Sequence, residues 1–594
     1  MLLLLLACPP ADPPKGGGEV CNSPNPSSSW SGSTVFREAT TEWGMEGVTG
    51  GRYAAGDLNG DGYPDLLVTE IFRNTRDDPA NGVFLHRVLM NEGGKSFRDA
   101  TVESGLVTAR DGHVGTSSTV HVLGDVDNDG DLDVFAGQTW DRADDAQADL
   151  SELYLNDGTG KFSLAPNSDI AQVGGYPTAG ASFVDANADG ILDLWVTGFY
   201  LEYGYDPAAQ AQLYLGNGDG TFRSVTEEMG LEMPSNSRDS YYEHFARRPA
   251  YGATACDVTG DGLTDLISTN YGRSWNHLWR NNGGSFTEIS EEAKFDGDDN
   301  HDYTDNLWYA CYCESNSCDP APTRSCGGSF PDNYWTPGRD DQPVRLNGNS
   351  FTTVCGDIDN DGDMDLYTTE ILHQWAGFSA DGSQLLLNDG TGHFERIDNE
   401  NNGLTRPRPR QGDWNEGDLH AAFFDFDNDG WKDILLSSSD YEKTQLWLWR
   451  QVSPGVFLEV SDATGLNQPW PAGVAVADFD RDGDLDVVTG SSNARSGTPW
   501  TTRQAHLYLN DSPPGNWIRL EGFPIGTQVT VTAGGISQTQ EVSGGYGHFG
   551  IQNDLPLQFG LGSVCQVDEV QARYPGGKVK SWAGVAGNQA VTLK

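Results

Sequence analysis

A nine-residue acidic motif occurs seven times along this chain of 594 residues and restricts its fold more than any other feature. Each copy has the pattern Asp-x-[Asp/Asn/Thr]-x-Asp-Gly-x-x-Asp and lies between two short apolar runs. The copies begin at Asp57, Asp125, Asp185, Asp257, Asp357, Asp425 and Asp478. Intervals of 53 to 100 residues between similar motifs indicate an array of repeated units rather than several unrelated domains.

Each unit is predicted to contain four short strands, here called A to D. In the first unit we expect them over residues 53–56, 65–69, 84–90 and 96–100, with the acidic motif between A and B. In the first six units a phenylalanine marks strand D: Phe97, Phe162, Phe222, Phe286, Phe394 and Phe457. Four-stranded units at this spacing are typical of β-propellers, and no long stretch has the apolar period of a helix. The sequence therefore predicts an all-β protein, a seven-bladed β-propeller with calcium loops between strands A and B, followed by a small β-rich C-terminal domain.

The seventh unit has no Phe-led strand D after its third strand. A spare strand around Phe36, ahead of the first motif, would fill this place and join the two ends of the array, which removes open sheet edges. The alternative is that residues 517–520 supply the missing strand. Closure through Phe36 would put the N-terminal segment and the C-terminal domain on the side of the acidic loops.

The acidic motif has the composition of a calcium loop. Positions 1, 3, 5 and 9 carry side-chain oxygens, position 7 offers a backbone carbonyl, and position 6 is always the glycine of a sharp turn. Carboxylates this close repel one another unless a hard cation lies between them, and six or seven flexible oxygens suit Ca²⁺ better than Mg²⁺. A solvated acidic turn would explain one copy but not seven, so we expect up to seven Ca²⁺ ions. The predicted ligand positions are Asp57, Asn59, Asp61, Tyr63, Asp65, Asp125, Asp127, Asp129, Asp131, Asp133, Asp185, Asn187, Asp189, Ile191, Asp193, Asp257, Thr259, Asp261, Leu263, Asp265, Asp357, Asp359, Asp361, Asp363, Asp365, Asp425, Asp427, Asp429, Trp431, Asp433, Asp478, Asp480, Asp482, Asp484 and Asp486.

The seven loops differ at position 3. Units two, five, six and seven have aspartate at positions 1, 3, 5 and 9, whereas units one and three have Asn59 and Asn187 at position 3. Unit four has Thr259 there, so we expect it to bind calcium most weakly.

The chain is strongly acidic. It has 87 Asp and Glu against 36 Lys and Arg, a formal net charge of −51. This charge argues against nucleic acid as a partner and against docking onto an anionic membrane surface. Aromatic residues make up 10% of the chain, far more than in a disordered acidic tail.

The N-terminal residues 1–8 resemble a signal segment that ends in a lipobox at Cys8, where we expect lipidation. Membrane contact would then be only through this lipid anchor. Residues 9–33 form a Pro/Gly/Ser-rich linker, 34–511 the propeller, and 515–594 the C-terminal domain. We therefore expect an extracellular or cell-surface protein, as an outer-membrane or periplasm-facing lipoprotein; a simple secreted form is the alternative.

Four cysteines cluster in an insert at about 291–350: Cys311, Cys313, Cys318 and Cys326. In an exported chain they predict two disulfides with three possible pairings, and a zinc site is the alternative. Cys256 and Cys355 lie near the ends of apolar runs and are interpreted as core residues.

The repeats resemble the FG-GAP/VCBS repeats of integrin-like β-propellers. The tail resembles the ASPIC/UnbV module through Gly534-Gly535, Gly544-Gly545-Tyr546, Phe559-Gly560-Leu561-Gly562 and Tyr574-Pro575-Gly576-Gly577. A propeller followed by this module is the layout of the cartilage acidic protein family and its bacterial relatives, although Tyr574 stands where that family usually has Trp. The resemblance implies an extracellular, calcium-binding protein without catalytic activity.

No catalytic motif of the common hydrolase, metalloprotease or nucleotide-binding types is present. Residues 545–550 match Gly-x-Gly-x-x-Gly, but no helix is expected after them, so they predict a turn. His113, His244 and His420 precede strands A near the expected channel mouth and are interpreted as ordinary loop histidines. We therefore expect a binding or adhesion module for a protein or glycan; the alternative is a propeller hydrolase or lyase that acts on an extracellular polymer.

Most of the variation in loop length falls on the face opposite the acidic loops. The inserts at 231–247, 291–350 and 398–419 carry aromatic residues, among which Trp308, Trp335 and Trp414 are the first candidates for ligand contact. The alternative, weighed equally, is that each insert packs around a small core of its own.

Overall fold

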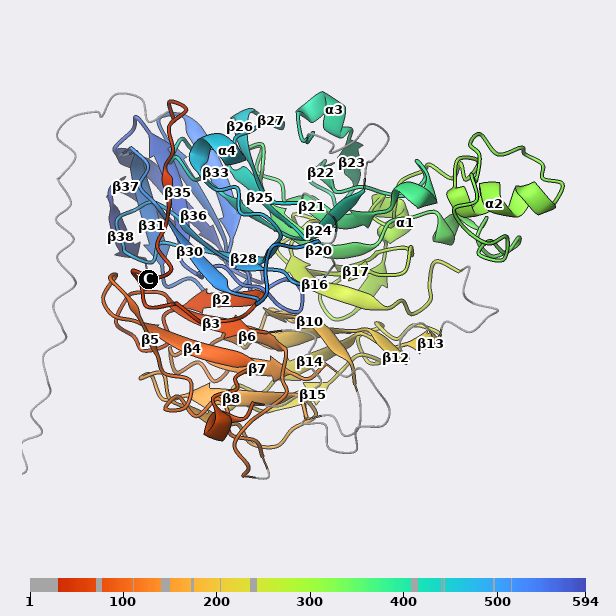
Figure 1. The fold of residues 1–594 in the computed structure, drawn as a ribbon. Helices are drawn as coiled ribbons and strands as arrows, with labels where there is room; N and C mark the ends of the chain where they lie inside the picture. Colours follow the sequence, from red (N-terminus) through yellow and green to blue (C-terminus); the bar gives the residue numbers. More distant parts are fainter. Residues whose placement is uncertain are drawn as a thin grey trace, which may run out of the picture.

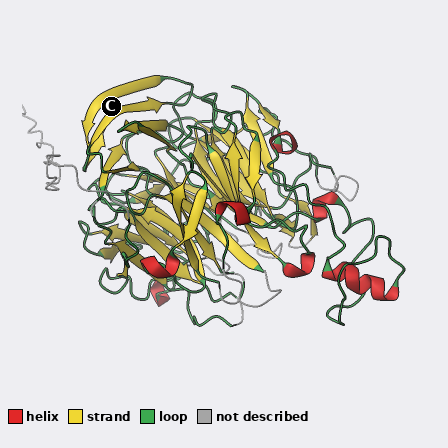
Figure 2. Ribbon diagram, turned by 90° about the horizontal axis from the view of Figure 1, so that it is seen from above, coloured by secondary structure: helices red, strands yellow, loops and turns green. Residues whose placement is uncertain are grey.

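The computed structural model describes residues 30–593, except 71–76, 111, 140–149, 172–175, 203–204, 236–242, 407–414, 440, 442–443, 495–496 and 514. The predicted lipobox, Cys8, and most of the linker therefore lie outside the described residues. The fold is all-β and propeller-like, and strands are far more abundant than helices (Figure 2). No helix in the described part of the chain is long and apolar enough to cross a bilayer.

Four antiparallel strands belong to each acidic motif, and we call each such group a sheet. The fourth sheet gains a fifth strand, β34 (Gly547–His548), and the fifth and sixth sheets are joined where β21 (Asp365–Leu372) pairs with β24 (Glu416–Phe424). The first four sheets consist of β2 (Arg52–Gly56), β3 (Asp65–Thr69), β4 (His86–Asn91) and β5 (Phe97–Asp99); β6 (Val120–Gly124), β7 (Asp133–Gly137), β8 (Glu152–Asn156) and β9 (Phe162–Leu164); β10 (Thr178–Val184), β11 (Asp193–Gly198), β14 (Gln212–Gly216) and β15 (Phe222–Ser224); β16 (Ala250–Cys256), β17 (Asp265–Asn270), β18 (His277–Asn281) and β19 (Phe286–Glu288). The last three consist of β20 (Ser350–Gly356), β21 (Asp365–Leu372), β22 (Gln384–Asn388) and β23 (Phe394–Ile397); β24 (Glu416–Phe424), β25 (Asp433–Ser438), β26 (Leu446–Ser453) and β27 (Val456–Glu459); β28 (Pro471–Ala477), β29 (Asp486–Ser491), β30 (Ala505–Asn510) and β1 (Phe36–Glu38).

The seventh sheet takes its fourth strand from the N-terminus. Strand β1 pairs with β30 in antiparallel register, with Phe36 opposite Asn510. The prediction that the strand around Phe36 supplies the fourth strand of the seventh unit is therefore confirmed. The alternative is wrong, because residues 517–520 belong to β31 (Asn516–Glu521), which pairs with β35 (Leu557–Gly562) and β38 (Gln589–Thr592).

The first strands of consecutive sheets contact one another in chain order, and the last one returns to the first. These contacts join β2, β6, β10, β16, β20, β24 and β28, and β28 then contacts β2. Figure 1 shows the seven strands around the middle of the molecule. They are buried along nearly their whole length, as the continuous apolar runs before each acidic motif require.

Side-chain amides at the ends of six third strands connect neighbouring sheets. Asn156, for example, donates through Nδ2 to the carbonyl of Leu58 in the preceding loop at 2.8 Å. The corresponding donors and acceptors are Asn91 with Phe479, Asn281 with Ala186, Asn388 with Val258, Gln451 with Ile358, and Asn510 with Phe426. We call these six groups the inter-sheet amides. The third sheet has Gly216 at this place, where an added Cβ would lie 2.2 Å from the carbonyl oxygen of Leu192.

The C-terminal domain contains two small sheets. One is formed by β31, β35 and β38, and the other by β32 (Gln528–Ala533), β33 (Ile536–Glu541), β36 (Gln566–Arg573) and β37 (Val579–Ala586). The domain hydrogen-bonds to the acidic loops of units four to seven, through Gly576, Thr539, Gly562 and Gln558. It therefore lies on the side of the acidic loops, as the sequence predicted.

One segment of this domain, residues 543–556, extends between the first strands of the sheets; we call it the channel segment. Its strand β34 (Gly547–His548) pairs with β16, and Gln552 exchanges backbone or side-chain hydrogen bonds with β2 and β6. Further hydrogen bonds reach β10, β20, β24 and β28. The Gly-x-Gly-x-x-Gly stretch predicted as a turn thus lies in the segment that contacts every first strand.

The insert after the fourth sheet is built around helix α2 (Leu307–Ser315) and projects from the body, as Figure 1 shows. Disulfides Cys311–Cys326 and Cys313–Cys318 confirm the prediction of two bridges. The remaining short elements are α1 (Ser290–Ala293), α3 (Asn399–Asn402), α4 (Ser461–Thr464), η1 (Pro79–Asn81), η2 (Pro343–Arg345), η3 (Gln374–Ala376) and the hairpin β12 (Tyr200–Glu202) with β13 (Tyr205–Ala208).

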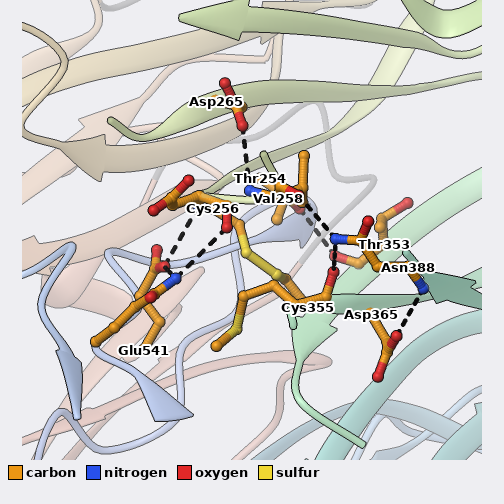
Figure 3. Close-up of a disulfide and its surroundings, with 12 residues drawn as sticks. Thr254, Cys256, Val258, Asp265, Thr353, Cys355, Asp365, Asn388 and Glu541 are labelled. Carbon is orange, nitrogen blue, oxygen red and sulfur yellow. Dashed lines mark hydrogen bonds between the residues drawn. A yellow bond between two sulfur atoms is a disulfide. The ribbon is translucent and has the colours of Figure 1, made fainter. Parts of the chain in front are cut away.

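A third disulfide joins Cys256 at the end of β16 to Cys355 in β20 (Figure 3). The interpretation of these two residues as simple core cysteines is therefore incomplete. Cys256 is buried, but its sulfur links the first strands of two neighbouring sheets immediately before their acidic loops.

Candidate metal centres

The seven acidic loops, named loop one to loop seven in chain order, share one backbone fold. In loop two the carboxylate of Asp125 accepts the N–H groups of Asp129 at 3.1 Å and Gly130 at 3.0 Å. Gly130 has a φ of +100°, a conformation in which side chains other than glycine are strained. Position 1 accepts the N–H of position 5 in all seven loops. The first carboxylate therefore folds the loop around itself.

Position 7 turns its N–H group toward the carboxylate of position 5 in every loop. In loop two Asp131 donates to Asp129 at 3.0 Å. The same bond is made by Tyr63, Ile191, Leu263, Asp363, Trp431 and Asp484. The backbone of position 7 is thus fixed beside the acidic cluster, as a carbonyl ligand requires.

Position 9 begins strand B and is buried. In loop two Asp133 accepts the N–H groups of Val126 at 2.9 Å and Asn156 at 2.8 Å, which ties the loop to the third strand. Burial raises the pKa of Asp133 to about 7, although these hydrogen bonds lower it. At the same position, burial raises the pKa of Asp65, Asp193 and Asp365 to about 8. A nearby cation would remove this cost of keeping a buried carboxylate charged.

Position 3 separates the loops into two groups. In loops two, five, six and seven one carboxylate oxygen of position 3 is buried and has no hydrogen-bond partner in the described part of the chain. These oxygens are Oδ1 of Asp127, Asp359, Asp427 and Asp480. An unpaired buried carboxylate oxygen is costly unless a cation binds it, so these four loops fit a metal ion.

The same four loops bring three carboxylates together. Their ligand oxygens lie within 4.8 Å of one another in the groups Asp125/Asp127/Asp133, Asp357/Asp359/Asp361, Asp425/Asp427/Asp433 and Asp478/Asp480/Asp486. These are the four loops that have aspartate at positions 1, 3, 5 and 9.

The other three loops satisfy position 3 internally. Asn59 Oδ1 accepts the N–H of Asp61 at 2.9 Å, and Asn187 Oδ1 accepts that of Asp189 at 3.0 Å. In loop four Thr259 donates its hydroxyl hydrogen to Asp265 at 3.1 Å. Weaker binding by loop four stays a prediction.

Arginines form ion pairs with the carboxylates of two loops in the described part of the chain, and the Lys432 ammonium donates to the backbone carbonyl of Asp357 in loop five at 3.3 Å. Arg450 bridges positions 3 and 5 of loop six, with Nε 2.8 Å from Asp427 and Nη2 2.5 Å from Asp429. It uses Oδ2 of Asp427 and leaves Oδ1 of that residue unpaired. Arg573 of the C-terminal domain forms an ion pair with Asp257 in loop four. Nothing in the sequence connects either arginine with an acidic loop.

The predicted ligand-face tryptophans do not form one exposed surface. Trp335 is only 3% exposed and packs against Tyr303 and Tyr309 in the core of the insert, which contradicts its assignment as an exposed contact residue. Trp308 is half-buried and stacks on Trp375 with ring centres 3.8 Å apart. Trp414 lies outside the described residues. The alternative that the insert packs around its own core is confirmed for the Cys-rich insert.

The three singled-out histidines are dispersed. His244 stacks on Trp275 with ring centres 3.6 Å apart, and His113 is half-buried in a separate loop. His420 lies within strand β24 and is buried, so its interpretation as a loop histidine is wrong. It hydrogen-bonds through Nε2 to the carbonyl of His548 in the channel segment at 3.1 Å. The structure therefore does not bring these side chains into one catalytic group.

A cleft of about 1030 Å³ lies beside the insert and reaches loop five. Carboxylates dominate its lining, which includes His244, Trp275, Lys294, Asp298, Asp361 and Arg396. No motif in the sequence marked this cleft, because its residues come from six separate stretches of the chain.

The family description FG-GAP-like repeat matches residues 57–136, 125–196, 357–436 and 425–489. The description ASPIC and UnbV matches residues 519–594. The sequence matches none of the curated proteins with which it was compared.

Among solved structures, the rhamnogalacturonan lyase YesW is 15% identical, with a TM-score of 0.38 over 78% of this chain and 72% of that one. The V. cholerae biofilm matrix protein Bap1 is 10% identical, with a TM-score of 0.29 over 93% of this chain and 62% of that one. Similarities this low carry no argument about function. The repeats and the tail do define the family: the chain is an FG-GAP-like repeat protein with a C-terminal ASPIC/UnbV domain.

Proposed function

We propose that this protein is a calcium-dependent, extracellular binding module built as a closed seven-bladed β-propeller. The unpaired position-3 oxygens of loops two, five, six and seven carry the calcium assignment, because each lies among carboxylates whose mutual repulsion a cation would remove. Flexible oxygen ligands favour Ca²⁺ over Mg²⁺.

The closed ring is supported by the contact of β28 with β2 and by the inter-sheet amide of Asn91, which reaches the carbonyl of Phe479 at 2.9 Å. An oxidising, extracellular location is supported by the three disulfides. Surface anchoring through Cys8 remains part of this proposal.

The binding site that we propose is the cleft beside the insert. It includes Asp359 and Asp361 of loop five, so calcium at that loop would shape one end of the cleft. The lining has more carboxylates than basic groups, which favours a protein segment or glycan that presents hydroxyl or positively charged groups. We expect no nucleic-acid partner for the same reason.

The test is a glycan array and a peptide array probed with the full chain in millimolar calcium and again in EDTA. We expect the chain to bind the array in calcium and to lose this binding in EDTA. The variants His244→Ala and Lys294→Ala should lose the binding in calcium as well. Lys161→Ala is the matched control, since it removes an exposed lysine from the second sheet, away from the cleft. Equal retention with and without calcium would refute the proposal, and cleavage of a bound glycan would favour a hydrolase or lyase.

A further inference from the structure

Loop four contains a cation that the chain itself supplies. The guanidinium of Arg573, at the end of β36, lies with Nη2 2.8 Å from Oδ2 of Asp257, the first position of the loop. Its Nη1 donates to the carbonyl of Gly260 at 3.0 Å. The Asp257 side chain is only 5% exposed, so this charge pair is largely shielded from solvent.

The buried carboxylate oxygens of loop four already accept hydrogen bonds within the protein. Thr259 donates its hydroxyl hydrogen to Oδ2 of Asp265, which also accepts the N–H groups of Val258 and Thr259 at 3.1 Å. Oδ1 of Asp265 accepts the N–H of Asn281 at 2.8 Å. No carboxylate oxygen of this loop is left buried and unpaired within the described residues, in contrast to loops two, five, six and seven.

The C-terminal domain provides a complete polar setting for Arg573. Gln528 accepts a hydrogen bond from the guanidinium, and its amide donates to Glu541 at 3.1 Å. Glu541 in turn accepts the N–H of Asp257 at 3.3 Å. The next turn adds a backbone bond from Gly576 to the carbonyl of Gly262 at 3.1 Å. Loop and domain are therefore joined by a network that needs no ion.

Loop four also differs from the other loops in its sequence. It has Thr259 at position 3, where the other six loops have aspartate or asparagine.

We propose that Arg573 takes the place of the metal ion in loop four, so that this loop is a docking socket for the C-terminal domain. A calcium ion there would be repelled by the guanidinium and would find no buried carboxylate oxygen without a partner in the described residues of the loop. Loop six is different, because Arg450 leaves Oδ1 of Asp427 available. The chain then binds at most six ions. This count rests on the proposed calcium binding, whereas the docking does not.

The first test counts bound Ca²⁺ by calorimetry and native mass spectrometry on the full chain. The same substitution is made at position 1 of two loops, Asp257→Asn in loop four and Asp125→Asn in loop two. We expect Asp125→Asn to lose one ion and Asp257→Asn to lose none. The loss of one ion from Asp257→Asn would overturn the proposal; an unchanged count for Asp125→Asn would contradict the proposed function instead.

The second test is a double-mutant cycle in EDTA, where calcium plays no part. We expect Asp257→Asn and Arg573→Met each to speed proteolytic release of the C-terminal domain by roughly tenfold. The double variant should release the domain no faster than either single variant. Arg223→Met is the control, since it removes an exposed arginine paired with Glu228. Its effect on the rate of release should simply add to the effect of Asp257→Asn. Additive effects of Asp257→Asn and Arg573→Met would show that the pair does not hold the domain.

Discussion

Removing the Cys256–Cys355 disulfide should destabilise the propeller by a calculable amount. The bridge closes a loop of 99 residues, and the chain-entropy relation for a loop of this length gives about 4.7 kcal/mol at 25 °C. For a chain of this size the unfolding entropy is about 1.2 kcal/mol/K, so the melting temperature of Cys256→Ala/Cys355→Ala should fall by about 4 °C.

The assay is calorimetry of the full chain in saturating calcium, so that only the covalent link changes. Cys313→Ala/Cys318→Ala is the matched control, since that bridge joins cysteines only five positions apart and the same relation gives about 2 kcal/mol. The control also acts within the insert rather than between two sheets. If the double variant at Cys256 and Cys355 had the melting temperature of the wild type, or a higher one than the control, the argument that this bridge restricts the unfolded chain would be refuted.

Three further predictions concern the loops, the sheet contacts and the channel. Asp127→Asn should lower the melting temperature in millimolar calcium by an amount that corresponds to about 1 kcal/mol and leave it unchanged in EDTA; equal shifts in both conditions would exclude an ion in loop two. Asn156→Ala leaves two buried carbonyls without their donor, so we expect urea titration to show a loss of about 1–3 kcal/mol; no loss would mean that the inter-sheet amides do not stabilise the ring. Burial, with Arg52 nearby, holds the pKa of His420 and His548 well below 6.5, so their contribution is present above pH 6.5 and is lost as pH falls below it. The melting temperature in calcium should therefore fall between pH 6.5 and 5, and it should fall less steeply with pH in His420→Gln. An equal dependence of the melting temperature on pH in both proteins would exclude His420 as a source of that dependence.

The repeated parts of the fold could be predicted from sequence because each unit repeats the same local signals. The glycine and the spaced carboxylates locate strands A and B, and the phenylalanine locates strand D. Strand β3 lies at the predicted residues, and β2 begins one residue earlier than expected. The place of β1 in the seventh sheet was also predictable, since counting the Phe-led strands leaves one spare strand at the N-terminus and one missing from the seventh unit.

Features that join different units were missed because they depend on contacts between distant residues. The channel segment is short and glycine-rich, with no period of its own, and its place follows only from the seven strands around it. Cys256 and Cys355 did carry a usable signal, because both lie within two residues of an acidic motif in consecutive units. Five of the seven third strands carry an asparagine at the inter-sheet position, with Gln451 and Gly216 in the other two, but the acceptors are backbone carbonyls, which the sequence does not mark. Trp335 could not be assigned correctly because disulfides and aromatic packing bury it within the insert.

The channel segment also determines when this protein can finish folding. Strand β1 can pair only after β30 has been synthesised, about 470 residues later. The space between the first strands is filled by residues 543–556, which are synthesised later still. At 5–20 residues per second, a ribosome needs about half a minute to two minutes to deliver the whole chain, and until then sheet edges and apolar strands stay open. The part made last becomes the innermost part, so the space between the first strands can be filled only after the C-terminal domain has been synthesised. A truncated chain would present an unfilled ring rather than a smaller folded protein.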